Sequence, residues 1–561
     1  MTAYEPPIDD IRFVLDHIAS MDGVAALPGL EAASPDVVDA ILEEAGKLAR
    51  NVWAPLDEVG DREGSVLENG VVRTPDGFRD AFRQFADGGW MGLTFPEAHN
   101  GQGLPWTLSA AVGEMWNAAN MTLHLCPLLT QAACEALLHH GTDEQKANWL
   151  DRLTTGEWTG AMCLTEPQAG TDVGALRTRA EREGDHYRIR GQKIFITFGD
   201  HDLSANIIHL VLARLPGAPE GTKGISLFIV PKYLPNADGT PGERNDMRPL
   251  KLEEKLGIHA SPTCVMSYGE DGGAIGYLLG KENEGMKCMF TMMNNARLAV
   301  GLEGLGISER ACQQAFAYAR ERVQFRPIIE HGDVRRMLTD MRAKITAMRA
   351  LCLYAASFVD RSVHHADDAE RHRARGRVAL LTPIVKAWCT DRALEITSTA
   401  LQVHGGMGFI EETGIARYYR DARITPIYEG TNGVQAMDLV GRKLQMEEGR
   451  LPFGLLDELE EDAGRDVRDA ITTLREVTRT LQAAGNEDRA AAAKAYLDMF
   501  GAVIGAALLE RGARQAASDS RGAPWPVLSR FFNATCLAPA LALTGAISGG
   551  ASLLSPAAEP R

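Results

Sequence analysis

A block of short β-prone segments separates two long helical stretches, and this pattern restricts the fold more than any other feature. The block extends from Gly160 to about Gly280, and its clearest segments are HYRIRGQKIFIT (186–197), NIIHLVLAR (206–214) and GISLFIVPKY (224–233). Each segment is bounded by Gly, Pro or Asp, as strands joined by turns usually are. The polar stretch from Pro235 to Arg248 is expected to be a loop. The block therefore predicts a β domain inserted between helical domains.

Helical periodicity dominates before and after this block. From Ser34 to Leu48, apolar residues recur at the 3.6-residue spacing of an amphipathic helix. Thr142 and Gln145 have the spacing of a capping box, which predicts the start of another helix. Towards the C-terminus we expect helices over about 333–363 and 378–404, with the charged segment between them exposed to solvent.

The fold class that these patterns predict is mainly α with an inserted β domain. A chain of 561 residues is long enough for several domains with buried cores. We expect four domains: a helical domain over 1–158, the β domain over 159–283, a helical bundle over 284–446, and an extra helical domain over 447–561.

Charge and cysteine usage disfavour several classes of protein. The 75 acidic and 58 basic residues give a net charge of -17, which opposes nucleic acid or an anionic membrane as the main partner. The N-terminal segment MTAYEPPIDD lacks the basic and apolar regions of a secretory signal, and the nine cysteines form no CxxC motif. We therefore expect a cytoplasmic protein with reduced, mostly buried thiols and no metal site.

An uncharged segment near the C-terminus, from Phe531 to Ala558, is long enough to cross a membrane. It is interrupted by Asn533, Pro539, Pro556 and several Gly and Ser residues. We therefore expect a packed helix here and no membrane span.

Glu429 is the strongest candidate for a catalytic group from the residues alone. It lies in RITPIYEGTNGVQ (423–435), between an aromatic residue and a turn of small residues. An isolated Glu in a loop is usually solvated. Here Ile427 and Tyr428 are expected to crowd apolar surface around the carboxylate, and desolvation raises the pKa of a carboxyl group. A carboxylate with a raised pKa suits a general base.

Three motifs together resemble the signature of the acyl-CoA dehydrogenase family: QVHGGMGF (402–409), YYRDAR (418–423) and IYEGT (427–431). The resemblance covers about residues 30 to 445 and implies an α-helical domain, a β-barrel-like domain and a four-helix bundle. With its C-terminal extension the chain looks like a longer subfamily, which includes the 3-methylmercaptopropionyl-CoA dehydrogenases of dimethylsulfoniopropionate breakdown. The implied activity is FAD-dependent oxidation of an acyl-CoA to the trans-2-enoyl-CoA, and 3-methylthiopropanoyl-CoA or another short-chain acyl-CoA is the expected substrate.

The resemblance assigns two segments of the β domain to the flavin. MCLTEPQAGTDVG (162–174) is similar to the family's flavin-binding segment, and KIFIT (193–197) to the strand whose aromatic residue stacks beside the flavin. The first segment would offer hydrogen bonds to the pyrimidine edge and a backbone that can approach the pyrophosphate. The residues assigned to FAD in this domain are Met162, Leu164, Thr165, Gly170, Thr171, Phe195 and Thr197.

A second group of residues is assigned by resemblance to the FAD of a neighbouring subunit, which implies a homodimer. ERVQFRPIIEHGDVRRML (321–338) resembles the segment that reaches across the dimer interface, although Arg326 stands alone where the family has a Gly-Lys pair. The residues assigned to this site are Arg322, Gln324, Gln402, Gly405 and Gly406, and Thr431 and Gly433 follow the catalytic turn.

The same resemblance assigns the substrate and the base. The thioester would contact Thr171, Asn294, Arg297 and Gly430. Some family members carry the catalytic Glu immediately before this Arg, but the chain has Ala296 there, so Glu429 is expected to be the base. Glu429 would remove the α proton while hydride leaves the β carbon for flavin N5, and its backbone N–H would stabilise the developing enolate. Electron-transfer flavoprotein is the implied electron acceptor.

Four alternatives stay open. An acyl-CoA oxidase of the same fold would pass electrons to oxygen, and a general fatty acyl-CoA dehydrogenase would prefer longer chains. A non-catalytic or DNA-associated flavoprotein would need a basic surface for phosphates, which the acidic composition opposes. The fourth alternative is a helical interaction module without a cofactor.

Overall fold

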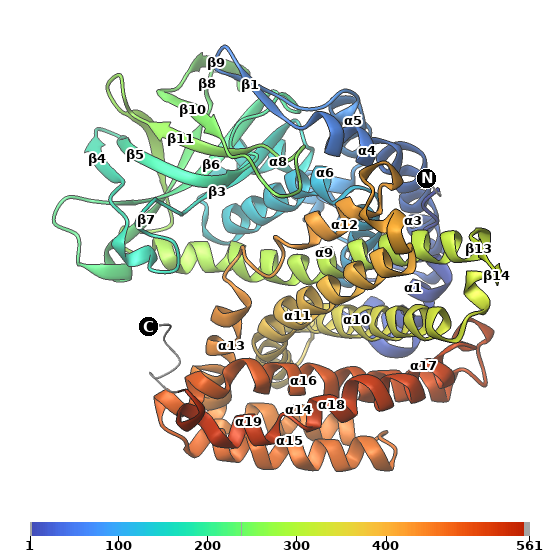
Figure 1. Ribbon diagram of the computed structural model, residues 1–561. Coiled ribbons are helices and arrows are strands. Elements are labelled where there is room, and N and C mark those ends of the chain that lie inside the picture. Colours follow the sequence, from blue (N-terminus) through green and yellow to red (C-terminus); the bar gives the residue numbers. More distant parts are fainter. Residues whose placement is uncertain (1–2, 237, 555–561) are drawn as a thin grey trace, which may run out of the picture. The chain divides into compact units, whose positions relative to one another are not determined.

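The computed structural model describes residues 3–236 and 238–554 (Figure 1). The chain forms two compact units. One, the helical unit, comprises Met1–Arg50, Pro105–Ala119 and Arg297–Arg561, and the other, the β unit, comprises Asn51–Leu104 and Asn120–Ala296. Two long helices contribute residues to both units, α6 (Trp106–His140) and α9 (Gly285–Glu321).

The β unit is built on an eight-stranded sheet. Neighbouring strands follow the order β10-β11-β5-β12-β7-β6-β3. Because β4 pairs with both β5 and β6, the strands β4, β5, β12, β7 and β6 close into a small barrel. The strands are β3 (Trp158–Cys163), β4 (Arg179–Glu183), β5 (His186–Thr197), β6 (Asn206–Arg214), β7 (Ile225–Pro231), β10 (Met247–Leu252), β11 (Thr263–Tyr268) and β12 (Ala274–Leu279).

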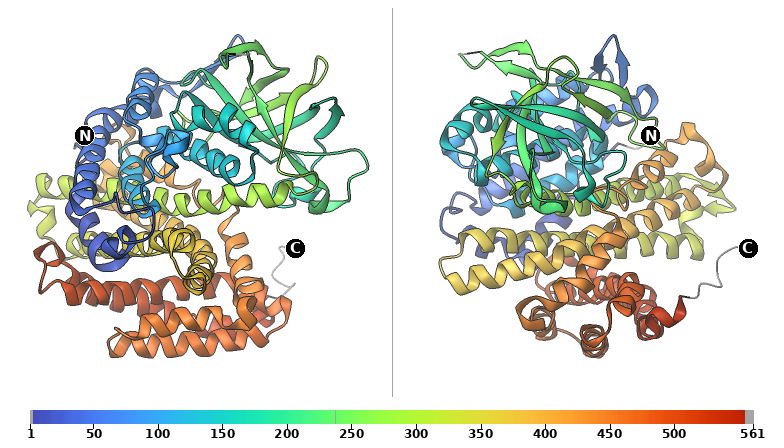
Figure 2. Two further views of the ribbon diagram at one scale, coloured as in Figure 1. Left: turned by 180° about the vertical axis from the view of Figure 1, so that it is seen from behind. Right: turned by 90° about the vertical axis from the view of Figure 1, so that its left-hand side faces the viewer.

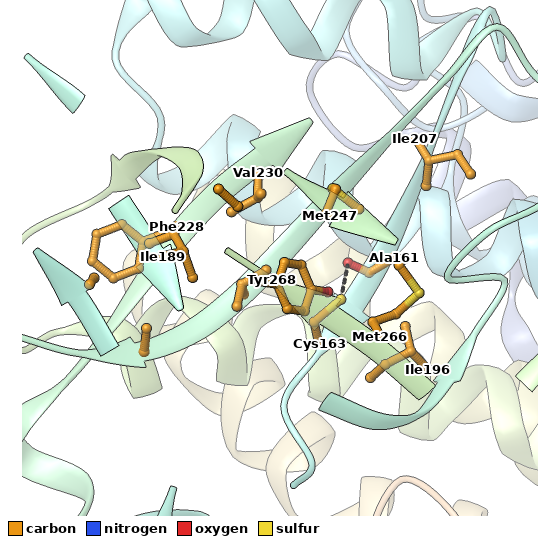
Figure 3. Close-up of a cluster of buried hydrophobic side chains, with 14 of the residues drawn as sticks. Ala161, Cys163, Ile189, Ile196, Ile207, Phe228, Val230, Met247, Met266 and Tyr268 are labelled. Atoms are coloured by element: carbon orange, nitrogen blue, oxygen red, sulfur yellow. Dashed lines mark hydrogen bonds between the residues drawn. The ribbon is translucent and has the colours of Figure 1, made fainter. Parts of the chain in front are cut away.

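The core of the β unit is a cluster of buried apolar side chains contributed by most of these strands (Figure 3). Ile189 on β5, Phe228 and Val230 on β7, and Tyr268 on β11 belong to it. Much of β5 alternates between buried and more exposed residues, as its period-two sequence pattern predicts, whereas β7 is buried throughout. The nine cysteines of the chain are free and buried, which confirms the expectation of buried thiols.

The strand predictions are confirmed except in one region. β5 and β6 have the predicted bounds, and β7 ends at Pro231. The loop predicted between Pro235 and Arg248 is wrong in part, because β8 (Tyr233–Pro235) pairs there with β9 (Pro241–Arg244). Proline has no N–H for a strand ladder and occurs mainly at edges. Pro235 and Pro241 therefore make the sequence of this short ribbon look like a loop.

The N-terminal part of the β unit contains helices and one hairpin. The capping box is confirmed, since the Thr142 hydroxyl accepts a hydrogen bond from the Gln145 N–H and the Gln145 side chain accepts one from the Thr142 N–H. The hairpin was not expected among helices, but its Asn69-Gly70 turn has the positive φ angles, 51° and 76°, that such turns require. The elements are α4 (Ala54–Glu63), β1 (Val66–Glu68), β2 (Val71–Arg73), α5 (Phe78–Asp87), α7 (Asp143–Gln145) and α8 (Asp151–Thr154).

The helical unit is organised around α10 (Gly332–His364) and α11 (Asp368–Val403), which lie side by side (Figure 1). The first of these confirms the helix predicted over 333–363. The second begins earlier than predicted, so most of the charged segment forms its first turns. Asp367 caps this start, because its carboxylate accepts hydrogen bonds from the N–H groups of Ala369 and Glu370.

The C-terminal region packs on these helices through α16 (Asn486–Gln515), which contacts α10, α11 and α13. Both views in Figure 2 show α14–α16 as a layer on one side of α10 and α11. A Cβ atom at Gly501 would lie 2.4 Å from the Trp388 ring, so glycine is needed for this close approach. The other helices of the unit are α1 (Ile8–Val14), α2 (Met21–Ala25), α3 (Pro35–Leu48), α12 (Ile415–Ala422), α13 (Asn432–Gly441), α14 (Leu451–Glu460), α15 (Arg465–Ala483), α17 (Trp525–Phe532), α18 (Ala538–Leu541) and α19 (Thr544–Gly549).

Three helical stretches of the described chain are long and apolar enough to cross a membrane: Trp106–His140, Asn486–Gln515 and Ser520–Leu553. In the first two stretches, 83% of the most apolar 18-residue segment is buried inside the protein, and in the third stretch 28% of it is buried. The third includes most of the uncharged segment, of which residues 555–558 lie outside the described residues. The described part is helical and contacts α16, although it is divided into short helices, including α17, α18 and α19, where one packed helix is expected.

Candidate active site

Glu429 lies in the loop between α12 and α13, and its backbone is left-handed. The φ angle is 56° at Glu429 and 87° at Gly430. A left-handed conformation at a residue other than glycine costs about 1–3 kcal/mol and persists only where the surrounding structure imposes it. Thr431 ends the loop as the N-cap of α13, since its hydroxyl accepts a 3.3 Å hydrogen bond from the Val434 N–H. The loop therefore presents Glu429 in one strained conformation.

Two side chains hold the backbone carbonyl of Glu429. The buried Arg297, on α9, donates a hydrogen bond from Nε to this oxygen at 3.2 Å. The side-chain amide of Gln435, on α13, donates to the carbonyl oxygens of Glu429 and Gly430, both at 3.3 Å. Arg297 and Gly430, both predicted to contact substrate, are thus brought together with Glu429.

Asn432 fixes the other end of the loop to α11. Its side-chain nitrogen lies 2.9 Å from the Thr390 hydroxyl, 2.8 Å from the Asp391 carboxylate and 3.1 Å from the Ala387 carbonyl oxygen. Its side-chain oxygen accepts a 2.8 Å hydrogen bond from the Lys386 ammonium group. Both Lys386 and Asn432 are buried. A buried polar network of this kind holds a backbone rigidly when its members are paired.

The electrostatic environment of Glu429 combines burial with two cations. Burial raises the pKa of Glu429, while Arg297 and Lys386 lower it, and the net pKa lies above the ordinary value. This confirms the direction predicted for a general base. Ile427 is itself 46% exposed, so its side chain contributes less to this burial than the sequence led us to expect.

The predicted cross-subunit residues Arg322 and Gln324 lie at an exposed hairpin formed by β13 (Val323–Gln324) and β14 (Arg326–Pro327). Phe325 at its tip has a φ angle of 64° and a fully exposed side chain. The segment with one residue fewer than the family pattern therefore folds as a tight turn that presents an aromatic ring to solvent.

The glycine-rich corner after α11 is exposed. Gln402 lies in the last turn of the helix, Gly405 has a φ angle of 59°, and Cβ atoms at Gly405 and Gly406 would meet nothing within 4 Å. Gly433, in the first turn of α13, is exposed as well. Backbone in such positions is open to close approach by a ligand or another chain.

In the β unit, the predicted flavin segment follows β3 and is fastened to β5. The Leu164 carbonyl oxygen accepts a 2.9 Å hydrogen bond from the Lys193 ammonium group, and the Thr165 carbonyl oxygen accepts one of 2.9 Å from the Ile194 N–H. Glu166 is buried and forms an ion pair of 2.8 Å with Lys193. This ion pair joins the two predicted flavin-binding segments and holds the turn at Glu166 in place.

Phe195 is turned outwards by a β-bulge. Between β5 and β11 the register shifts, so that Ile196 pairs with Cys264 but Lys193 pairs with Met266. β5 thus has one extra residue at this point, and Phe195 has a φ angle of 59° and is 60% exposed. Bulges commonly redirect a side chain next to a functional site.

The remaining predicted residues of the β unit differ in burial. Met162 is buried in β3, and Thr197 is half-buried at the end of β5. Thr171 is exposed, a Cβ atom at Gly170 would meet nothing within 4 Å, and Asn294 is exposed on α9.

These residues suit a flavin nucleotide. An isoalloxazine ring needs a flat apolar surface and hydrogen-bond groups at its edge, and the exposed ring of Phe195 and the polar turn at Leu164 and Thr165 offer both. The open backbone at Gly170 suits a pyrophosphate, because N–H groups can approach its oxygens closely.

Comparison with known sequences identifies the family. The acyl-CoA dehydrogenase N-terminal domain matches residues 38–157, the middle domain matches 161–269, and the C-terminal domain matches 283–444. The chain belongs to the acyl-CoA dehydrogenase family. It is therefore an FAD-dependent oxidoreductase that acts on an acyl-CoA, and the fold predicted from the sequence is confirmed.

Relatives and solved structures support this assignment. The chain is 49% identical to 3-methylmercaptopropionyl-CoA dehydrogenase of Ruegeria pomeroyi over 80% of this chain and 77% of the relative. A solved chain described with the electron transferring flavoprotein of Acidaminococcus fermentans is 30% identical, with a TM-score of 0.61 over 74% of this chain and 99% of that one. ACDH-11 of Caenorhabditis elegans, in complex with C11-CoA, shares the fold at 20% identity, with a TM-score of 0.80 over 96% of this chain and 93% of that one.

Sequence reasoning missed three residues around the loop: Glu303, Lys386 and Asn432. The first two are single charged residues within apolar helical runs, LAVGLEGLG (298–306) and TPIVKAW (382–388). A lone charge inside such a run is a signal of a buried, paired group, because ionisable side chains are seldom fully buried otherwise. Asn432 carried no such signal, since its position beside Gly433 is equally typical of a turn.

Proposed function

We propose that this acyl-CoA dehydrogenase oxidises short-chain acyl-CoA thioesters, with 3-methylthiopropanoyl-CoA as its first candidate substrate. The observation that supports this most strongly is the 49% identity to a dehydrogenase named for that thioester, across 80% of the chain.

Glu429 is the proposed base, and the chain's own residues prepare it for that role. Its raised pKa favours proton uptake from the α carbon, while Arg297 and Lys386 favour the ionised form that can accept the proton. The hydrogen bonds of Arg297 and Gln435 to its carbonyl oxygen hold the peptide in place. The backbone N–H of Glu429 is proposed to donate to the thioester carbonyl. Bound FAD supplies the acceptor for the hydride that leaves the β carbon.

The remaining predicted residues form the proposed cofactor and substrate sites. We assign Met162, Leu164, Thr165, Gly170, Thr171, Phe195, Thr197, Thr431 and Gly433 to FAD, and Thr171, Asn294, Arg297 and Gly430 to the substrate. The bulge that exposes Phe195 and the open backbone at Gly170 support the FAD assignment.

A homodimer is proposed for the assembly, with Arg322, Gln324, Gln402, Gly405 and Gly406 of each subunit contacting FAD in its neighbour. The exposure of large apolar side chains beside these residues supports it, because such side chains usually become covered in an assembly. Phe325 is 103% exposed, and Phe409 is 92% exposed.

Electron-transfer flavoprotein is the proposed electron acceptor. The similarity to a chain solved in work on an electron transferring flavoprotein supports this choice over oxygen. Slow oxygen consumption by the substrate-reduced enzyme, with rapid reoxidation by electron-transfer flavoprotein, is the expected result. Rapid oxygen uptake would instead identify an acyl-CoA oxidase.

An anaerobic titration of the purified protein tests the substrate proposal. Flavin absorbance is followed with 3-methylthiopropanoyl-CoA, butanoyl-CoA and octanoyl-CoA. The fastest bleaching is expected with the methylthio or butanoyl thioester. Preference for octanoyl-CoA would contradict the proposal and indicate a general fatty acyl-CoA dehydrogenase, while bleaching by none of the three would indicate a non-catalytic flavoprotein.

A further inference from the structure

Glu303 is a fully buried carboxyl group on α9 that the proposed reaction does not use. Its side chain is 0% exposed, and it lies in a run of Gly and Leu residues. One carboxyl oxygen, Oε2, accepts a hydrogen bond from the Tyr428 hydroxyl. The other, Oε1, has no hydrogen-bond partner within the described residues. Tyr428 immediately precedes Glu429, so this buried acid is linked directly to the loop of the proposed base.

The surroundings of Glu303 disfavour its ionised form. A buried carboxylate is stable only when both oxygens are paired, and here one is not. Two nearby carboxyl groups also oppose each other's ionisation, and Glu429 acts on Glu303 in this way. Burial is the largest effect and, although Tyr428 and Lys386 oppose it, the pKa of Glu303 is raised to about 8.

The charged groups around Glu303 and Glu429 lie on or next to α9, α11, α12 and α13. Lys386 on α11 is the cation that faces both carboxyl groups, and burial lowers the pKa of Lys386 to about 8. We call Glu303, Tyr428, Glu429, Lys386 and Arg297 the Glu303 cluster. Within it Arg297 acts on Glu429, and other charges act on its members: Asp391 on Lys386, Asp421 on Tyr428, and Asp438 and Arg442 on Arg297.

We propose that Glu303 is a positioning residue that keeps a proton next to the catalytic base, so that Glu429 is the carboxyl group of the pair that ionises at neutral pH. The proposal rests on the function proposed above and deepens it. Protonated Glu303 accepts the Tyr428 hydrogen bond without adding a second negative charge. Loss of its proton at higher pH places a charge beside Glu429, which raises the affinity of Glu429 for a proton.

The predicted consequence is a second ionisation in the pH profile of flavin reduction. The acid limb reports Glu429, and a further inflection near pH 8 reports the coupled titration of Glu303 and Lys386, whose pKa values both lie at about 8. Glu303→Gln keeps the size and neutral charge of the protonated acid. Its rate below about pH 7 should therefore stay within about twofold of wild type, while the inflection near pH 8 becomes smaller, because only Lys386 of the two groups still titrates there.

The experiment measures anaerobic flavin bleaching by 3-methylthiopropanoyl-CoA between about pH 5.5 and 9.5 in the wild-type holoenzyme, Glu303→Gln and Glu461→Gln. Glu461 is exposed, so Glu461→Gln makes the same chemical change outside the cluster and should reproduce the wild-type profile. Superimposable profiles for wild type and Glu303→Gln would overturn the proposal. So would a Glu303→Gln rate that is reduced tenfold or more at low pH.

Tyr428→Phe provides a second variant if Glu303→Gln does not fold. The Tyr428 hydroxyl favours the ionised form of Glu303, so its removal should move the alkaline inflection to higher pH. An unchanged or lowered inflection would contradict the proposal.

Infrared difference spectroscopy between about pH 6.5 and 9.5 tests the protonation state without turnover. A protonated-carboxyl band that disappears at the higher pH should be present in wild type and Glu461→Gln and missing in Glu303→Gln. Its presence in Glu303→Gln would overturn the proposal. If none of the three acyl-CoA thioesters bleaches the flavin, the proposed function fails, while the infrared result still decides the protonation of Glu303.

Discussion

The Lys386 ammonium group donates a 2.8 Å hydrogen bond to the side-chain oxygen of Asn432, which follows Glu429, Gly430 and Thr431 in the chain. Both side chains are buried, with 0% and 6% of their surface exposed. The contact ties the strained loop of the proposed base to α11. Because a left-handed backbone at Glu429 persists only under external constraint, the geometry of the base depends on this contact.

Asn432→Ala should slow flavin reduction while FAD remains bound. The substitution leaves Lys386 buried without its hydrogen-bond acceptor, which costs about 1–3 kcal/mol, and it frees the loop from α11. A reduction in rate of about tenfold or more and a lower melting temperature are expected. Rapid mixing and calorimetry measure these effects. Asn486→Ala, at an exposed position, is the control, and a wild-type rate in Asn432→Ala would contradict the role of the loop anchor.

Arg297→Gln should move the acid limb of the pH profile to higher pH. Arg297 favours the ionised form of Glu429, so its removal raises the pKa of the base further. At a fixed pH near that limb, less of the enzyme then carries an ionised base. The measurement is the pH dependence of flavin bleaching under saturating substrate. A shift to lower pH would show that Arg297 does not act on Glu429 by its charge.

Lys193→Met should destabilise the β unit. Lys193 and Glu166 form a buried ion pair, and removal of one partner leaves an uncompensated charge, at a cost of about 3–5 kcal/mol. Urea unfolding measures the effect. Lys251→Met, at an exposed ion pair, is the matched control and should change stability by less than about 1 kcal/mol. Equal effects of the two substitutions would contradict the structural role of the buried pair.

The same ion pair predicts a dependence of stability on acid. Burial alone would raise the pKa of Glu166, but Lys193, Thr178 and the Arg177 N–H outweigh it and hold the pKa at about 2. The depressed pKa contributes stability that is complete above the ordinary value of 4.5 and is lost as the pH falls towards 2. Unfolding measured across this range should show the loss in wild type. In Lys193→Met, the pKa of Glu166 is no longer held down by the ammonium group, so the loss of stability between pH 4.5 and 2 should be smaller than in wild type. An identical acid dependence would exclude the pair as its source.

Phe195→Ala should weaken retention of FAD with little change in the stability of the apoprotein. The ring is 60% exposed, so its truncation removes little buried surface from the protein itself. Loss of an aromatic contact with the cofactor should lower FAD occupancy after dialysis, which absorbance measures. Full occupancy in Phe195→Ala would contradict the assignment of this ring to the flavin.

Local patterns were sufficient to predict much of the fold. The capping box at Thr142, the alternation along 186–197 and the spacing between Ser34 and Leu48 depend on neighbouring residues, and the structure has a helix start, a strand and a helix there. The start of α11 was harder to predict because its first turns are exposed and charged, so no apolar stripe marks them. Its cap at Asp367 is the local signal that identifies the start.

The surroundings of the base required tertiary structure. The IYEGT motif identifies Glu429, but its left-handed backbone and its contacts with Arg297 depend on segments more than a hundred residues apart in the sequence. The unpaired oxygen of Glu303 and the hydrogen bond between Lys386 and Asn432 likewise arise where α9, α11 and the loop before α13 meet. Neither periodicity nor composition predicts which side chains face each other at such a point.

Anaerobic reduction of the Glu429→Gln variant tests the central claim most directly. The amide keeps the size of the side chain but cannot take up the α proton. Flavin bleaching by 3-methylthiopropanoyl-CoA should therefore slow by about 10²–10⁴-fold, while FAD and the acyl-CoA still bind. Bleaching at the wild-type rate would show that another group removes the proton and that Glu429 is not the base.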